Sequence, residues 1–157
     1  MDLPKKIVGE NYILVYSVPR TSLLRKAVSY FASKFNLKVV SIDKMLTGMN
    51  SVDIQIRTAG PEDFIRLFSE ASFVITDSFH GTCFSVNFEK PFVCIPATDK
   101  ANRQEGLLSS LGLLDRIVYS EDRFDSISRQ IDYSNASKRL NNLRQDSLSI
   151  LERSINL

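Results

Sequence analysis

The chain has 157 residues, of which 43% are hydrophobic and 24% charged, and 20 Lys and Arg against 18 Asp and Glu give a net charge of +2. These values are typical of a globular domain and exclude a chain that is disordered throughout. Because the charge is near balance and no run of basic residues exceeds two, we expect no nucleic-acid partner and no anionic membrane surface as partner.

Cysteine content and the lack of long apolar runs predict a cytoplasmic protein. Cys83 and Cys94 both lie in apolar surroundings, and two cysteines are too few for a disulfide framework or a zinc site. We expect two buried thiols in a reducing compartment, and no metal. No apolar stretch approaches the roughly 20 residues of a membrane span, so no span is expected. Gly9, Glu10 and Asn11 interrupt the sequence before any signal-peptide core develops.

In the first third of the chain, short apolar runs alternate with one amphipathic stretch. Thr21 or Ser22 can cap a helix whose apolar positions continue to Phe35 at helical spacing. The apolar runs are typical of strands buried on both faces. The expected strands cover 12–18, 37–42 and, weakly marked, 54–56, with a polar connection over 43–51.

The pattern repeats more sharply from Gly60. Pro61 suits the first turn of a helix, where its missing N–H has no partner to lose. Gly112 suits the left-handed position that ends a helix. The expected strands cover 72–75, 91–96 and 117–119, and the expected helices open at 60–62, run from the caps at 76–78 to about 88, and cover 104–111 and 135–157.

This alternation of strands and helices predicts a single Rossmann-like α/β domain over 1–157, with a parallel sheet covered by helices on both faces. In such sheets the ligand crevice lies beyond the carboxyl ends of the strands. Three junctions meet there: 17–19, 76–82 and 97–103.

The junction 76–82 is the richest in functional groups. The first N–H groups of a helix have no internal partners and carry partial positive charge, so the turn can hold a phosphate or a carboxylate. Ser78 and Thr82 can add hydroxyl donors, and Gly81 lets a ligand approach the backbone closely. Thr76 and Asp77 complete the group of candidate binding residues.

His80 is the only histidine of the chain, so any imidazole acid–base chemistry must use it. Arg103, in the neighbouring junction, can neutralise a bound anion. The same residues also have structural interpretations: His80, Asp77 and Ser78 as helix caps, and Arg103 as a solvated charge. No glycine-rich phosphate loop, metal-ligand cluster or Gly-x-Ser-x-Gly turn occurs in the sequence.

The string Thr-Asp-Ser-Phe-His-Gly-Thr at 76–82 stands in a longer pattern that runs from Gly60 and continues through 84–85 and 90–92. Asn102-Arg103 and the leucines of 107–113 extend it. This pattern resembles the C-terminal domain of the polysaccharide pyruvyl transferase family. The resemblance is sharp from Gly60 to Leu114 and loose elsewhere.

The resemblance implies an enzyme of bacterial surface-polysaccharide and exopolysaccharide biosynthesis, with a fold like one half of a two-domain GT-B glycosyltransferase. Such enzymes transfer a pyruvyl group from phosphoenolpyruvate to sugar hydroxyls, so the expected ligands are this donor substrate and a glycan acceptor, with no separate cofactor. The resemblance implies a catalytic role for His80. Some members carry an arginine two residues before this histidine, where Ser78 stands here, and Arg103 is the obvious substitute.

Enzymes of the family have two domains with the acceptor cleft between them, and 157 residues suffice for one. We therefore expect a missing N-terminal domain or a partner chain, and an apolar patch beside the 76–82 turn. Two alternatives stay open. One is a GT-B nucleotide-sugar domain, in which Glu62 could bind the ribose, and the other is a truncated, non-catalytic binding domain.

Overall fold

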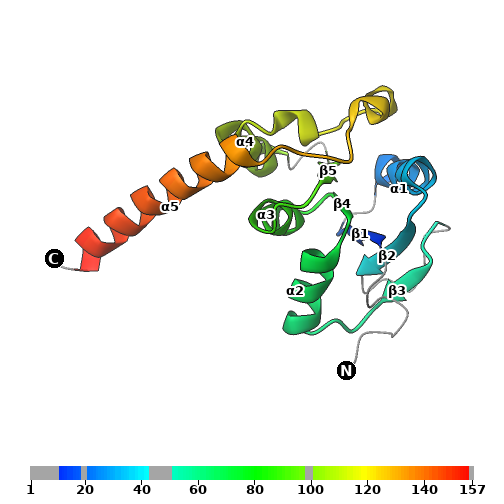
Figure 1. Ribbon diagram of the computed structural model, residues 1–157, viewed down its shortest axis with the longest axis horizontal. Helices are drawn as coiled ribbons and strands as arrows, with labels where there is room; N and C mark the ends of the chain where they lie inside the picture. The colour runs from blue at the N-terminus through cyan, green and yellow to red at the C-terminus, as the bar shows by residue number, and fades with distance from the viewer. Residues whose placement is uncertain (1–10, 19–20, 43–50, 98–100, 156–157) are drawn as a thin grey trace.

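The computed structural model describes residues 11–18, 21–42, 51–97 and 101–155. Within these ranges, five parallel strands form one sheet in the order β3-β2-β1-β4-β5 (Figure 1). Val15 of β1 pairs with Ser41 on one side and Ile75 on the other. The strands are β1 (Tyr12–Tyr16), β2 (Lys38–Ile42), β3 (Ile54–Ile56), β4 (Phe73–Thr76) and β5 (Phe92–Cys94).

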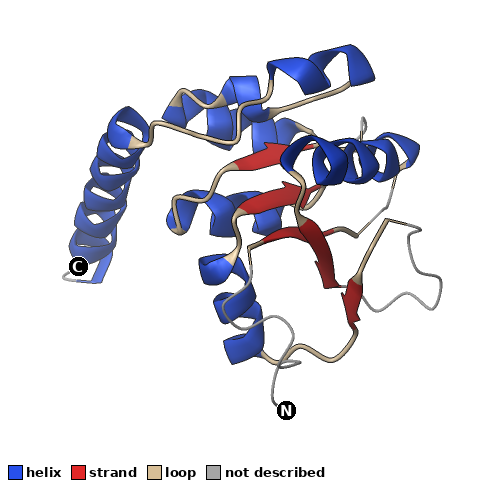
Figure 2. Cartoon of the chain, turned by 45° about the vertical axis from the view of Figure 1, so that its right-hand side comes forward, coloured by secondary structure: helices blue, strands red, loops and turns tan. Residues whose placement is uncertain are grey.

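Helices cover both faces of the sheet, so the predicted Rossmann-like α/β fold is confirmed. The helix α1 and the 3₁₀ helix η2 lie on one face, whereas α2, α3 and α4 pack on the other (Figures 1 and 2). The helices are α1 (Ser22–Phe35), α2 (Pro61–Glu70), α3 (Phe79–Asn87), α4 (Asn102–Leu111) and α5 (Ser134–Ile155), with 3₁₀ helices η1 (Leu114–Arg116) and η2 (Glu121–Ser126).

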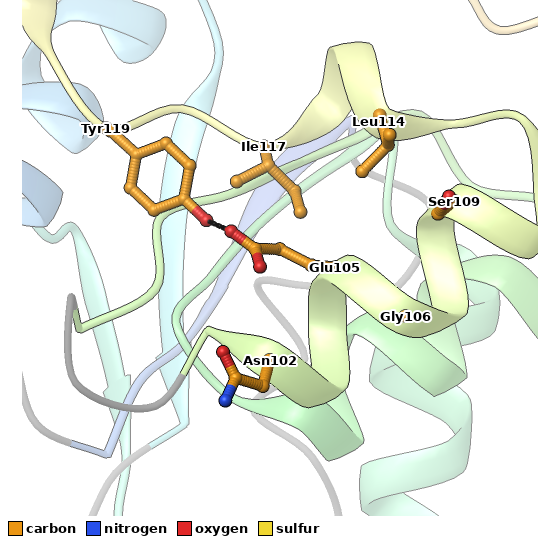
Figure 3. Close-up of a pocket in the computed structure, with 7 residues that line it drawn as sticks. All are labelled: Asn102, Glu105, Gly106, Ser109, Leu114, Ile117 and Tyr119. Atoms are coloured by element: carbon orange, nitrogen blue, oxygen red, sulfur yellow. Dashed lines mark hydrogen bonds between the residues drawn. The ribbon is translucent and has the colours of Figure 1, made fainter.

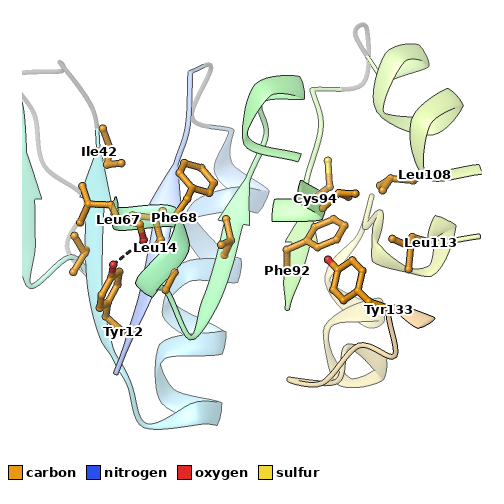
Figure 4. Close-up of a cluster of buried hydrophobic side chains, with 14 of the residues drawn as sticks. Tyr12, Leu14, Ile42, Leu67, Phe68, Phe92, Cys94, Leu108, Leu113 and Tyr133 are labelled. Atoms are coloured by element: carbon orange, nitrogen blue, oxygen red, sulfur yellow. Dashed lines mark hydrogen bonds between the residues drawn. The ribbon is translucent and has the colours of Figure 1, made fainter. Parts of the chain in front are cut away.

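The core has two apolar layers because successive side chains of a strand point to opposite faces of the sheet. Ile13 of β1 packs in the layer under α1, whereas its neighbour Leu14 packs in the layer under α2 and α3. In the second layer, Phe68 of α2 is fully buried, and the Tyr12 hydroxyl donates to the Leu67 carbonyl at 2.7 Å (Figure 4). Burial on both faces explains why the strand sequences are almost continuously apolar.

The helix ends mostly follow the sequence signals. Thr21 caps α1 by accepting from the Leu24 N–H at 3.2 Å, Pro61 is the first residue of α2, and Gly112 ends α4 at φ 74°. The strand expected over 117–119 is reduced to a single bridge between Ile117 and Cys94, since Tyr119 already faces solvent. All but the last residue of the 43–51 connection lies outside the described residues.

The strand order places a topological switch point between β1 and β4. From β1 the chain adds β2 and β3 on one side, and it then returns to place β4 and β5 on the other side. The connections that leave β1 and β4 therefore diverge, which opens a crevice at their carboxyl ends. No helix in the described part of the chain has the length and apolar character needed to cross a membrane.

Candidate anion-binding site

Asp77 joins the two strands at the switch point. Its carboxylate accepts hydrogen bonds from the Ser17 hydroxyl at 2.6 Å and from the Val18 N–H at 2.8 Å. Only 5% of Asp77 is exposed. The carboxylate thus fixes the end of β1 against the end of β4, and this structural role occupies both of its oxygens.

Thr76, Gly81 and Thr82 lie beneath the surface of the turn. The Thr76 hydroxyl donates to the Tyr16 carbonyl at 2.6 Å and accepts from the Ser78 N–H at 3.1 Å. The fully buried Thr82 hydroxyl donates to the Ser78 carbonyl at 3.1 Å. The side chains of these two threonines therefore stabilise the shape of the turn from inside.

Gly81 is required by packing within the protein. A Cβ atom at this position would lie 2.9 Å from the Thr76 Cβ and 3.1 Å from a ring carbon of Tyr16. Real Cβ atoms essentially never approach another atom to less than 3.0 Å, so the contact with Thr76 would force a shift. The absent side chain at Gly81 thus makes room for β1 and β4, and close approach of a ligand to Gly81 stays a prediction.

The N-terminus of α3 faces the crevice. Ser78 is the N-cap residue in extended conformation, and its hydroxyl makes no capping hydrogen bond, in contrast to the expected side-chain cap. The first helical bond runs from the Thr82 N–H to the Ser78 carbonyl at 3.0 Å, so the N–H groups of 79–81 precede it. The first turn contains no acidic residue, so the helix dipole favours a negative charge here.

A cavity of about 290 Å³ opens at this point. Exposed His80 lies at the cavity, and the Arg103 guanidinium stacks 5.0 Å from the centre of the Phe79 ring. The structure thus brings Asp77, Ser78, His80 and Arg103 together, as predicted from the junctions. The cavity is lined by Val18, Asp77, Ser78, Phe79, His80, Ala97, Arg103 and Gln104.

Gln104 is a cavity residue that was not identified from the sequence. Only 3% of it is exposed, and its Nε2 donates to the Asp77 carbonyl at 3.2 Å. It follows Arg103 in the first turn of α4, at the carboxyl end of β5. That position is the sequence signal that could have identified it, because the first turns of helices at this edge face the crevice.

A larger hollow of about 590 Å³ lies between α4 and the segment 114–119 (Figure 3). Its lining includes Glu105, which accepts a hydrogen bond from Tyr119, and no cationic side chain. Partial burial of the phenol and the nearby Glu105 carboxylate raise the pKa of Tyr119 to about 12. The smaller cavity is therefore more favourable for an anion, because Arg103 and the α3 N-terminus meet there.

The thiols do not contribute a nucleophile to the cavity. Cys94 is fully buried beneath Thr82, and burial raises the pKa of its thiol to about 12. Cys83 is only half-buried, and burial likewise raises its pKa. The prediction of a buried thiol is thus confirmed for Cys94 alone. The described residues contain no group of three or more His, Cys, Asp or Glu side chains that could hold a metal ion.

The model of the family described as polysaccharide pyruvyl transferase matches residues 4–98. The chain belongs to the polysaccharide pyruvyl transferase family. This match covers more than half of the sequence, includes the sheet from β1 to β5, and confirms the resemblance drawn from the 60–82 pattern. No curated protein matches the sequence of this chain significantly.

Solved structures share the fold at low sequence identity. A UDP-GlcNAc 2-epimerase from Neisseria meningitidis, bound to UDP-GlcNAc, matches with a TM-score of 0.52 and 14% identity, over 90% of this chain and 46% of its own. A UDP-GlcNAc 2-epimerase from Methanocaldococcus jannaschii, in complex with UDP-GlcNAc and UDP, matches with a TM-score of 0.50 and 11% identity, over 90% and 49%. The chain thus spans about half the length of these GT-B-type structures.

Proposed function

We propose that this chain is the donor-binding half of a pyruvyl transferase, which transfers a pyruvyl group from phosphoenolpyruvate to a sugar hydroxyl in bacterial exopolysaccharide synthesis. One observation carries the proposal. In a chain of this family, the α3 N-terminus, His80 and Arg103 meet at a single cavity at the switch point of the sheet. The proposal places the enzyme in the cytoplasm, where phosphoenolpyruvate is made.

In the proposed reaction, the N–H groups of α3 and Arg103 hold the anionic groups of phosphoenolpyruvate. Protonation of the methylene carbon creates a cationic centre at the neighbouring carbon. A sugar hydroxyl attacks that centre and loses its proton, and departure of the phosphate then leaves a second cationic centre. A second hydroxyl of the sugar attacks this centre and loses its proton, which completes the ketal. His80 is the group of this cavity that can give the first proton or accept the second, and the helix end and Arg103 stabilise the charge on the departing phosphate.

Calorimetric titration with phosphoenolpyruvate tests the proposed donor site. We expect Arg103→Ala to weaken binding roughly 10- to 100-fold, since a hydrogen bond to a charged group contributes about 1.5–3 kcal/mol. Arg153→Ala, on the far turn of α5, is the matched control and should bind like the unchanged chain. Equal binding by the Arg103 and Arg153 variants would place the donor elsewhere.

The same titration with UDP-GlcNAc addresses the nucleotide-sugar alternative, which is motivated by the fold shared with the two epimerases. Tight binding of UDP-GlcNAc without binding of phosphoenolpyruvate would replace the pyruvyl donor by a nucleotide sugar.

Catalysis is tested separately by measuring the rate of pyruvyl transfer. His80→Ala should lower this rate about 10²–10⁴-fold if the imidazole moves a proton.

The activity further requires a second half that completes the acceptor cleft, and we propose that α5 contacts it. This proposal is supported by the coverage of about half of the GT-B-type structures and by the position of α5, which extends away from the sheet (Figures 1 and 2). Beside the 76–82 turn, Val18 is 67% exposed, but most large exposed apolar side chains belong to α5. These α5 residues are Leu143, Leu148, Ile150, Leu151 and Ile155.

Co-expression with a candidate N-terminal half tests this partnership. We expect the two halves to co-purify and Leu151→Glu to prevent it, because that substitution places a charge in the middle of the apolar surface of α5. If the chain alone transfers the pyruvyl group, the proposed need for a second half and the non-catalytic alternative are both refuted.

A further inference from the structure

The orientation of the Gln104 amide is fixed by its neighbour. The Asp77 carbonyl can only accept a hydrogen bond, so the group 3.2 Å from it must be the Nε2 donor of Gln104. The other end of the amide is therefore Oε1, an acceptor. This assignment follows from hydrogen-bond chemistry and does not depend on distinguishing oxygen from nitrogen by position.

That acceptor has no hydrogen-bond partner among the described residues, although it is closed off from bulk water. In a capping box, a glutamine at the third position of a helix accepts from the N-cap backbone N–H. Here the N-cap residue Ala101 has a helical conformation, and α4 has no side-chain cap. A buried acceptor without a partner costs about 1–3 kcal/mol, so such atoms in proteins usually meet a water or a ligand.

The chemistry around Gln104 restricts what that partner can be. An anion in the cavity meets donors from the α3 N-terminus and from Arg103, and Gln104, whose buried Oε1 is an unpaired acceptor, lines the same cavity. Oε1 would repel a phosphate or carboxylate oxygen and attract an O–H or N–H group. A ligand that satisfies both therefore carries a hydroxyl or amine beside its anionic group.

We infer that Gln104 is a specificity-determining residue, which accepts a hydrogen bond from a hydroxyl group held beside the bound anion. The inference rests on the proposed function, in which phosphoenolpyruvate itself has no alcohol hydroxyl and the attacking sugar supplies one. In that reaction Gln104 would hold the sugar hydroxyl beside the donor. The Nε2 contact with the Asp77 carbonyl fixes the amide relative to the turn that binds the anion.

Two probes that differ by one hydroxyl test the inference. 2-Phosphoglycerate and 2-phospholactate carry the same phosphate and carboxylate, and only the former has an alcohol hydroxyl. We expect the unchanged chain to bind 2-phosphoglycerate about fivefold more tightly, as one net hydrogen bond allows. Gln104→Met, which has similar volume and no amide acceptor, should remove this preference. Gln145→Met, on the exposed part of α5, is the control and should keep it.

The ratio of the two affinities separates recognition from a structural effect. Loss of the bond to Asp77 alone would weaken both probes equally and leave the preference in place, which would overturn the inference. Equal binding of the two probes to the unchanged chain would also overturn it, while the anion site and the proposed function would stand. If neither probe nor phosphoenolpyruvate binds, the anion site itself is wrong and the inference falls with it.

Discussion

Gly81→Ala is the substitution for which the structure makes the sharpest statement. The new methyl group would lie 2.9 Å from the Thr76 Cβ, and closer still to the Thr76 hydroxyl oxygen. Overpacking of this kind costs about 1–3 kcal/mol. A shift of Thr76 would also weaken the hydrogen bonds to Tyr16 and Ser78, each worth about 1 kcal/mol.

Alanine regains about 0.5–1 kcal/mol through its higher helix propensity, so we expect a net loss of about 2 kcal/mol for Gly81→Ala. For a protein of this size that corresponds to a fall in Tm of about 4–8 °C. Gly106→Ala is the matched control, because a Cβ there has no neighbouring atom within 4 Å and the residue lies inside α4. It should raise the Tm slightly.

Thermal unfolding followed by circular dichroism measures both variants under one condition. Opposite signs for the two glycines would support the packing role of Gly81. A Gly81→Ala variant at least as stable as the unchanged chain would refute that role. The glycine would then be explained by close approach of a ligand, as its sequence position first suggested.

Three further outcomes follow from the described contacts. Asp77→Asn should lower the free energy of unfolding in urea by about 1–3 kcal/mol, because the charged acceptor of Ser17 and Val18 is lost. Iodoacetamide at pH 8 should leave Cys94 unmodified in the folded chain and modify it after unfolding, as mass spectrometry of the peptides would show. The raised pKa of Cys94 also makes the free energy of unfolding depend on pH. Its contribution is fully present below a pH of about 9, the pKa of the unfolded thiol, and should be lost as the pH rises toward 12. Urea unfolding at several pH values would measure this loss.

The fold was predictable because its signals are local. Strands buried on both faces must be apolar at nearly every position, and helix ends depend on residues such as Thr21, Pro61 and Gly112 that act within one turn. The prediction of a strand at 117–119 was wrong because its signal is not local. Three apolar residues indicate burial, but whether they pair depends on the neighbouring β5, which is only three residues long.

The candidate site was predictable in position but less so in the role of each residue. In open parallel sheets, ligands bind at the carboxyl ends of the strands beside the switch point. That Asp77 binds Ser17, sixty residues earlier, depends on which strands are neighbours, and no local pattern contains that information. Gln104 was not identified from the sequence for the same reason, because its significance comes from its contact with the Asp77 carbonyl in another turn.

The helix α5 carries apolar side chains that the described part of the chain leaves largely uncovered. In the structure Ala136, near its start, is the only buried residue of α5, while Leu148, Leu151 and Ile155 are each more than half exposed. Full burial of one such side chain is worth about 1.5–3 kcal/mol. Most of that free energy is therefore still available to a partner that covers the exposed apolar side chains of α5.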